Sequence, residues 1–209
     1  MTGFSSMTAI HRETRAFVRA GLLSICVMIG AYTPALAAED RGGASSTYRL
    51  FSASCLRLLA IPQDVRIWAS KMQLSAITDP AQLNTFVGPG KNGVAWDFPR
   101  TFGGKYSLSI RGTSQACAVW AESGDPQIAE ELFRKVVSGA ATTGAVVTTD
   151  DDQSFSTADG KGRILIMSVT SKNGAGYQFT LMTGERPGAF FAGAPVQLSM
   201  QMLQIAAKK

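Results

Sequence analysis

Few residues in this chain are of types that could carry out catalysis or bind a metal. The position of the only histidine reduces the number of possible sites further. The only histidine, His11, lies in an N-terminal segment that we expect to be removed on export. The expected mature chain therefore has no imidazole, which excludes Ser-His-Asp and Cys-His nucleophilic sites and histidine-ligated metal sites. Carboxylates and two cysteines remain as candidates.

The two cysteines are Cys55 and Cys117, since the third, Cys26, lies in the segment expected to be removed. An even pair in an oxidising compartment is most simply a disulfide. A loop of about 60 residues closed in this way would stabilise the fold by roughly 4 kcal/mol. Reactive thiols would need a basic or helix N-terminal setting, whereas the neighbours of Cys117 are apolar.

The carboxylates offer two kinds of site. Asp97, Glu122 and Asp125 are candidates for paired acid and base chemistry on a glycan or wall component. The three aspartates at residues 150–152 either hold a hard cation through oxygen ligands or form a solvated acidic loop. This run lacks ligands at alternate positions and an internal glycine, so it matches no calcium loop. We predict no catalytic residue, no metal and no cofactor.

Aromatic side chains in segments typical of loops are the candidates for recognition. Residues 93–100 (GVAWDFPR) form one such segment, and the alternative role for it is to anchor a loop in the core. The side chains of this segment predicted to face a partner are Trp96, Asp97, Phe98 and Arg100. Phe190 and Phe191 lie in a connection rich in glycine and proline, where they either plug the open end of a sheet or contact a partner.

The N-terminal residues have the features of a signal peptide. Three arginines and one glutamate precede an apolar block at residues 21–31, and Ala35 and Ala37 then follow Pro34 in small-x-small spacing. We expect cleavage after Ala37, which makes residues 1–37 the signal peptide. An uncleaved anchor is the alternative, because residues 20–38 carry no charge and roughly that number can span a bilayer.

The remaining 172 residues (209 minus 37) suit one domain. We expect a flexible leader at residues 38–46, which are small and polar, and a single domain at residues 47–207. Removal of the signal peptide lowers the net charge from +5 to +3, because 17 bases (20 minus 3) then face 14 acids (15 minus 1). No basic run is interleaved with aromatics, so we predict no nucleic-acid partner, and no membrane contact after cleavage.

Four helices are predicted from apolar spacing and capping signals. They lie within residues 47–60, from Pro62 to about residue 72, from Pro80 to residue 87 and from Pro126 to residue 139. On the polar side of the last helix, Glu130 and Arg134 have the favourable i,i+4 order.

Strands are predicted where the period changes to two. These are residues 106–111, 116–121, 162–171 and a segment around 177–181, with the last two joined as a hairpin; residues 196–205 fit a strand better than a helix. We therefore predict an α+β domain: an antiparallel sheet of about four to five strands, with N-terminal helices and one inserted helix packed on one face. A disulfide would tie the first helix to the sheet.

Short motifs spread over most of the mature chain carry a resemblance. Phe51 and Cys55 lie on the opening helix, a strand cysteine follows about sixty residues later, and Gly193-Ala194-Pro195 precedes the last strand. In these features the chain resembles small exported proteobacterial proteins of uncharacterised function. The resemblance implies a periplasmic α+β domain with a single disulfide and no assigned reaction.

These observations predict a periplasmic or secreted protein that is not an enzyme. We expect a non-catalytic binding or accessory protein that acts on a cell-envelope or secreted protein partner. The alternatives are a carboxylate-based enzyme acting on a glycan or wall component, and an enzyme inhibitor that inserts residues 93–100 into a cleft.

Overall fold

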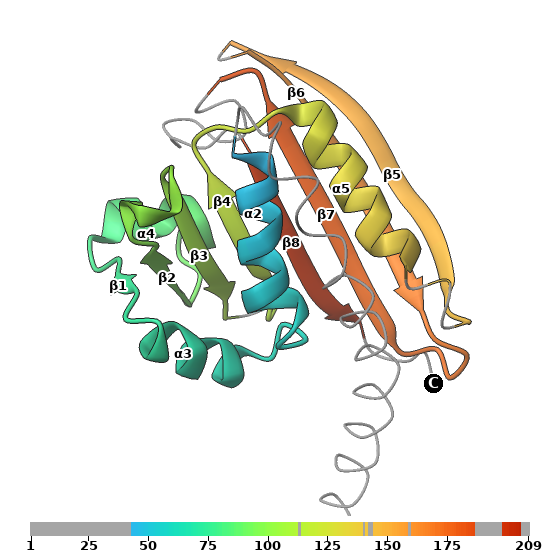
Figure 1. The fold of residues 1–209 in the computed structure, drawn as a ribbon, viewed down its shortest axis with the longest axis horizontal. Coiled ribbons are helices and arrows are strands. Elements are labelled where there is room, and N and C mark those ends of the chain that lie inside the picture. Colours follow the sequence, from blue (N-terminus) through green and yellow to red (C-terminus); the bar gives the residue numbers. More distant parts are fainter. Residues whose placement is uncertain are drawn as a thin grey trace, which may run out of the picture. The chain divides into compact units, whose positions relative to one another are not determined.

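The computed structural model describes residues 43–112, 114–139, 141, 144–158, 160–186 and 198–205. Within these ranges, the fold consists of one antiparallel sheet of eight strands and four α-helices (Figure 1). The predicted signal peptide at residues 1–37 lies outside them. So do Phe190 and Phe191.

The helices begin where proline and capping residues predict them. Their bounds are α2 Ala44–Phe51, α3 Pro62–Lys71, α4 Pro80–Val87 and α5 Pro126–Gly139. Asp79 caps α4 by accepting a hydrogen bond from the Gln82 backbone N–H at 2.8 Å, and Asp125 does the same for the Gln127 N–H of α5 at 2.8 Å. Helix α2 starts at Ala44, before the expected Thr47, and continues into a π-helical segment, η1 (Ser52–Leu56).

The strands follow the chain in one order and the sheet in another. Their bounds are β1 Ser75–Ala76, β2 Gly93–Asp97, β3 Tyr106–Arg111, β4 Cys117–Ala121, β5 Val146–Thr157, β6 Gly160–Thr170, β7 Gly176–Gly184 and β8 Leu198–Ile205. The order in the sheet is β1-β2-β3-β4-β8-β7-β6-β5. The last strand thus lies between β4 and β7, and β5 is one edge of the sheet.

The predicted sheet of four to five strands is wrong, because the sheet has eight. The five predicted strands correspond to β3, β4, β6, β7 and β8, while β1, β2 and β5 were not expected. Strand β5 escaped recognition because most of its side chains are exposed at the sheet edge, so the sequence shows no alternation of apolar and polar residues. Strand β1 has only two residues.

The helices lie on both faces of the sheet, so the prediction that they share one face is also wrong. Figure 1 shows α2 and α5 in front of the strands from β4 to β6. Helix α4 packs on the other face, where Phe86 and Val87 join a core cluster with Ala118 and Trp120 of β4. Successive residues of a strand point to opposite faces, and Cys117 of the same strand faces the α2 side.

The predicted disulfide is present in the structure. Cys55 of η1 and Cys117 of β4 are joined, and both residues are fully buried. The bond ties the end of the first helical segment to the middle of the sheet. Among the described residues, no helix has the length and apolar character needed to cross a membrane.

Candidate functional site

Residues 93–97 of the predicted recognition loop form a strand instead. This strand, β2, pairs with β1 on one side and with β3 on the other. Trp96 lies opposite Ala76 and Leu108 and is half-buried. The half-buried Asp97 carboxylate accepts a hydrogen bond from the Ser107 hydroxyl at 2.6 Å. The segment therefore does not project as the loop that an inhibitor would insert into a cleft.

Phe98 follows β2 and belongs to the core. Only 5% of it is exposed, and its ring lies edge-on between Trp68 and Phe102, with centroid separations of 6.2 and 5.7 Å. Arg100 is exposed in the 3-10 turn that follows. Of the four side chains predicted to face a partner here, only Arg100 is fully on the surface, and Phe98 has the anchoring role that was the alternative.

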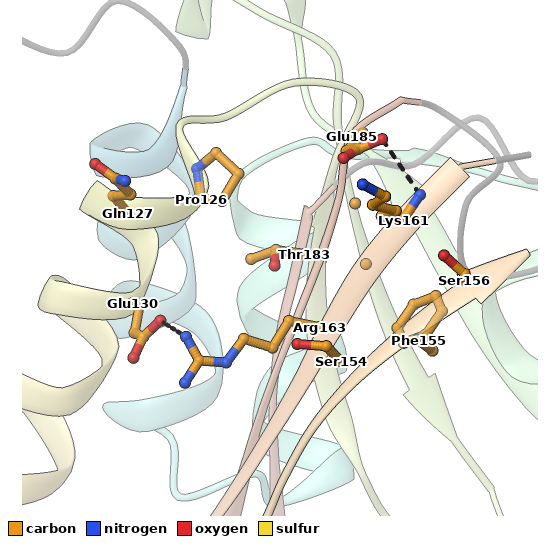
Figure 2. A pocket seen from close by; sticks show the side chains of 12 residues that line it. Pro126, Gln127, Glu130, Ser154, Phe155, Ser156, Lys161, Arg163, Thr183 and Glu185 are labelled. Atoms are coloured by element: carbon orange, nitrogen blue, oxygen red, sulfur yellow. Dashed lines mark hydrogen bonds and ion pairs between the residues drawn. The ribbon is translucent and has the colours of Figure 1, made fainter.

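An open pocket of about 470 Å³ lies between the N-terminal half of α5 and the ends of β5, β6 and β7. Figure 2 shows this pocket with the side chains around it. We call it the α5–β5 groove. The residues that matter for its chemistry are Gln127, Glu130, Ser154, Ser156, Lys161 and Arg163.

The groove exists because the sheet extends beyond the helix that covers it. Helix α5 packs over β6 and β7 through apolar residues, while the last residues of β5 contribute the small side chains of Ser154 and Ser156 on this face. Ser154 lies opposite Arg163, and Ser156 lies opposite Lys161. Two serines in place of large side chains leave the space beside the helix open.

Two arginines and two carboxylates form an ion-pair network along the groove. The Arg163 guanidinium donates to the Asp152 carboxylate on β5 at 2.8 Å and also to Glu130 on α5, as Figure 2 shows for the second contact. Arg134 donates to Glu130 at 2.8 Å and to Asp152 at 3.4 Å. The predicted i,i+4 pair of Glu130 and Arg134 is thus present, within a larger network.

This network keeps the Asp152 carboxylate charged. The hydrogen bond from Arg163 is the main cause that lowers the pKa of Asp152, and the pKa of Arg163 is raised mainly by the same bond. A general acid near neutral pH needs the opposite shift, in which burial raises the pKa of a carboxyl group. The shift of Asp152 is therefore opposite to that of a general acid.

The acidic run at residues 150–152 lies in strand β5, where its members point to different faces. Asp152 faces α5, while Asp150 lies at a β-bulge and accepts hydrogen bonds from Ser168, from Thr148 at 3.0 Å and from Gln178 at 3.3 Å. The Ser168 bond is the main cause that lowers the pKa of Asp150. Among the described residues, no group of three or more acidic, cysteine or histidine side chains is placed to hold a metal.

The three carboxylates proposed for enzyme chemistry each have a structural partner. Asp97 accepts from Ser107, Glu122 forms an ion pair with Lys105 at 2.6 Å, and Asp125 caps helix α5. Each interaction explains the carboxylate without a reaction.

Apart from Glu130, which was expected to pair with Arg134, the groove residues were not singled out from the sequence. Ser154, Ser156 and Lys161 come from two polar strand ends on either side of a tight turn, and a single sequence does not show that they line one space. One signal was present: Arg163 is a charged residue at the start of the apolar strand that follows Gly162. A charged side chain at that position is a candidate for an ion pair with a neighbouring element.

A comparison with models of known protein families found no match, and a comparison with curated proteins found none either. The function of the chain is therefore inferred from the groove and its surroundings.

Proposed function

We propose that this chain is an exported, non-catalytic binding protein that acts on a cell-envelope or secreted protein partner, and that the α5–β5 groove is its binding site. One observation carries the proposal. The groove is open and rich in hydrogen-bonding groups, yet its network carboxylates, Glu130 and Asp152, are already held by arginines.

Among the residues that the structure describes, no activating base lies beside the hydroxyl groups of the groove. Ser154 and Ser156 would need a neighbouring imidazole or a desolvated lysine to act as nucleophiles. The one histidine of the chain is His11, which lies outside the described residues. Lys161, opposite Ser156, is exposed and lacks the burial that such a role requires. The groove offers donors, acceptors and charge to a ligand.

The buried disulfide supports the proposed compartment. Structural disulfides persist in the periplasm and outside the cell, and reducing conditions in the cytosol make them rare there. The bond between Cys55 and Cys117 joins two segments of the core that are far apart in sequence. A protein that depends on this bond would reach its stable state after export.

The proposal is tested by filling the groove. A tagged full-length chain is compared with Ser156→Trp, which places a large ring in the groove, and with Gln82→Trp, which places the same ring on the exposed surface of α4. We expect the unchanged chain and Gln82→Trp to retain the same partner from envelope extracts, and Ser156→Trp to lose it. Equal retention by all three chains would refute the groove as the site.

A further inference from the structure

Among the described residues, strand β5 is an edge strand of the sheet. It has 12 residues and forms one end of the sheet order, so β6 pairs with its inner side and no strand among the described ranges pairs with its outer side. An edge strand offers a row of backbone donors and acceptors to another extended chain. Peptide segments bind other proteins by adding to such edges.

The devices that protect an edge are confined to the first half of β5. A bulge interrupts the pairing between Thr149 and Asp151, and the acidic run lies at the same place. From Gln153 to Thr157 the strand pairs with β6 without a shift and carries no charge, proline or glycine. The half without a bulge or an acidic residue is the half that borders the groove.

The groove beside this half of β5 contains one cationic side chain, Lys161, that forms no ion pair with the described residues. Arg163 is held by Glu130 and Asp152, whereas the Lys161 side chain has no ion pair within the described ranges. The nearby Glu185 carboxylate accepts from the backbone N–H of Lys161, at 3.4 Å. Because Ser156 is small and lies directly opposite Lys161, an acidic side chain next to Ser156 on an added strand could reach the Lys161 ammonium.

We propose that an extended segment of the partner protein adds to β5 alongside residues 153–157, with an acidic side chain over Ser156 that pairs with Lys161. This inference rests on the proposed function and names the chemistry of its partner. The alternate side chains of the added strand lie beside Phe155 on the other face. The Phe155 ring there covers Gly162, where an added Cβ atom would clash with the ring. An apolar residue suits that position.

A second copy of the chain fits this edge less well than a partner segment. If two β5 strands paired along their full length in antiparallel fashion, Asp151 of each copy would lie opposite Asp152 of the other, within two acidic runs. Like charges directly opposite each other destabilise strand pairs. The acidic run would also repel an acidic residue of the partner. Such a residue can therefore lie only at the Lys161 end of β5.

The test uses two fluorescein-labelled peptides, TVTVEVTV and TVTVKVTV, with binding followed by fluorescence anisotropy. We expect the full chain to bind the glutamate peptide about fivefold more tightly than the lysine peptide, as one exposed ion pair allows. Lys161→Glu should reverse this preference. Lys172→Glu changes the same charge at an exposed turn beyond the other end of β6 and should leave the preference unchanged. A glutamate peptide methylated on alternate backbone nitrogens should not bind.

The outcomes separate this inference from the proposed function. Equal affinity for both peptides, or binding that survives backbone methylation, would overturn strand addition. If Ser156→Trp still abolished partner retention in that case, the groove would remain the binding site. Retention of the partner by Ser156→Trp would refute both. Light scattering that showed dimers held through β5 would identify a second copy as the occupant and would also overturn the inference.

Discussion

Arg163 and Asp152 form a two-point ion pair across strands β6 and β5. The Arg163 Nε atom lies 2.8 Å from Oδ1 of Asp152, and Nη2 lies 2.8 Å from Oδ2. The same guanidinium donates to Glu130 on α5. One arginine therefore fastens the edge strand to the helix above it, and the shape of the groove depends on this connection.

We expect Asp152→Asn to lower the free energy of unfolding by about 1 kcal/mol, because it removes the charge that both arginines share. Asp151→Asn is the matched control, since Asp151 is the adjacent residue and belongs to no ion pair in the described ranges; we expect a change within about 0.5 kcal/mol. Urea denaturation measures both. Equal losses in the two variants would show that the network adds nothing to stability.

The stability of the fold should depend on acid pH through Asp150 and Asp152. Hydrogen bonds lower the pKa of both carboxyl groups in the folded state below the ordinary value of 3.8. The two carboxylates therefore contribute fully to the stability of the fold when the pH is above this ordinary value. The contribution is lost as the pH falls from the ordinary value through the lower pKa values of the folded state. We expect the melting temperature to fall less between about pH 5 and about pH 2 in Asp150→Asn/Asp152→Asn than in the unchanged chain. Parallel curves, measured by circular dichroism, would contradict this.

Loss of the disulfide should be the largest single change in stability. Cys55 and Cys117 are separated by 62 residues, so replacing both by alanine should lower the free energy of unfolding by roughly 4 kcal/mol. Domains of this kind are stable by only about 5–15 kcal/mol, so the variant would be close to unfolding at physiological temperature. Urea denaturation again provides the measurement. A loss below about 1 kcal/mol would mean that the bond is not needed for the fold.

Phe98 and Phe102 provide a matched pair that separates core packing from surface exposure. Phe98 is 5% exposed and Phe102 is 37% exposed, although their rings are in contact. We expect Phe98→Ala to cost roughly 3 kcal/mol and Phe102→Ala less than about 1 kcal/mol. If Phe98→Ala abolished partner binding without any loss of stability, its side chain would belong to a recognition surface after all.

Much of this fold could be predicted because local signals and tertiary structure agree. The starts of α3, α4 and α5 were predicted from proline and capping aspartates, and β3 and β4 from alternating or apolar runs. The disulfide followed from the number of cysteines and the expected compartment. In each case a few neighbouring residues carry the information.

The missed features depend on contacts between distant segments. The polar run from Thr148 to Thr157 forms a strand because β6 supplies its hydrogen-bonding partners. Its own side chains do not alternate between apolar and polar, so they do not indicate a strand. Helix α4 lies on the opposite face from α2, which the sequence pattern of either helix does not specify. The groove combines α5 with three strands that follow it, and its central contact joins Glu130 to Arg163, 33 residues apart.

The most direct test places a photo-reactive benzoylphenylalanine at Ser156 in the groove or at Gln82 on α4 of the full chain, in cells that export the protein. If the groove is the binding site, irradiation should join the Ser156 variant to a discrete partner and leave the Gln82 variant free. The absence of any cross-linked product at Ser156, or the same product at both positions, would contradict the account.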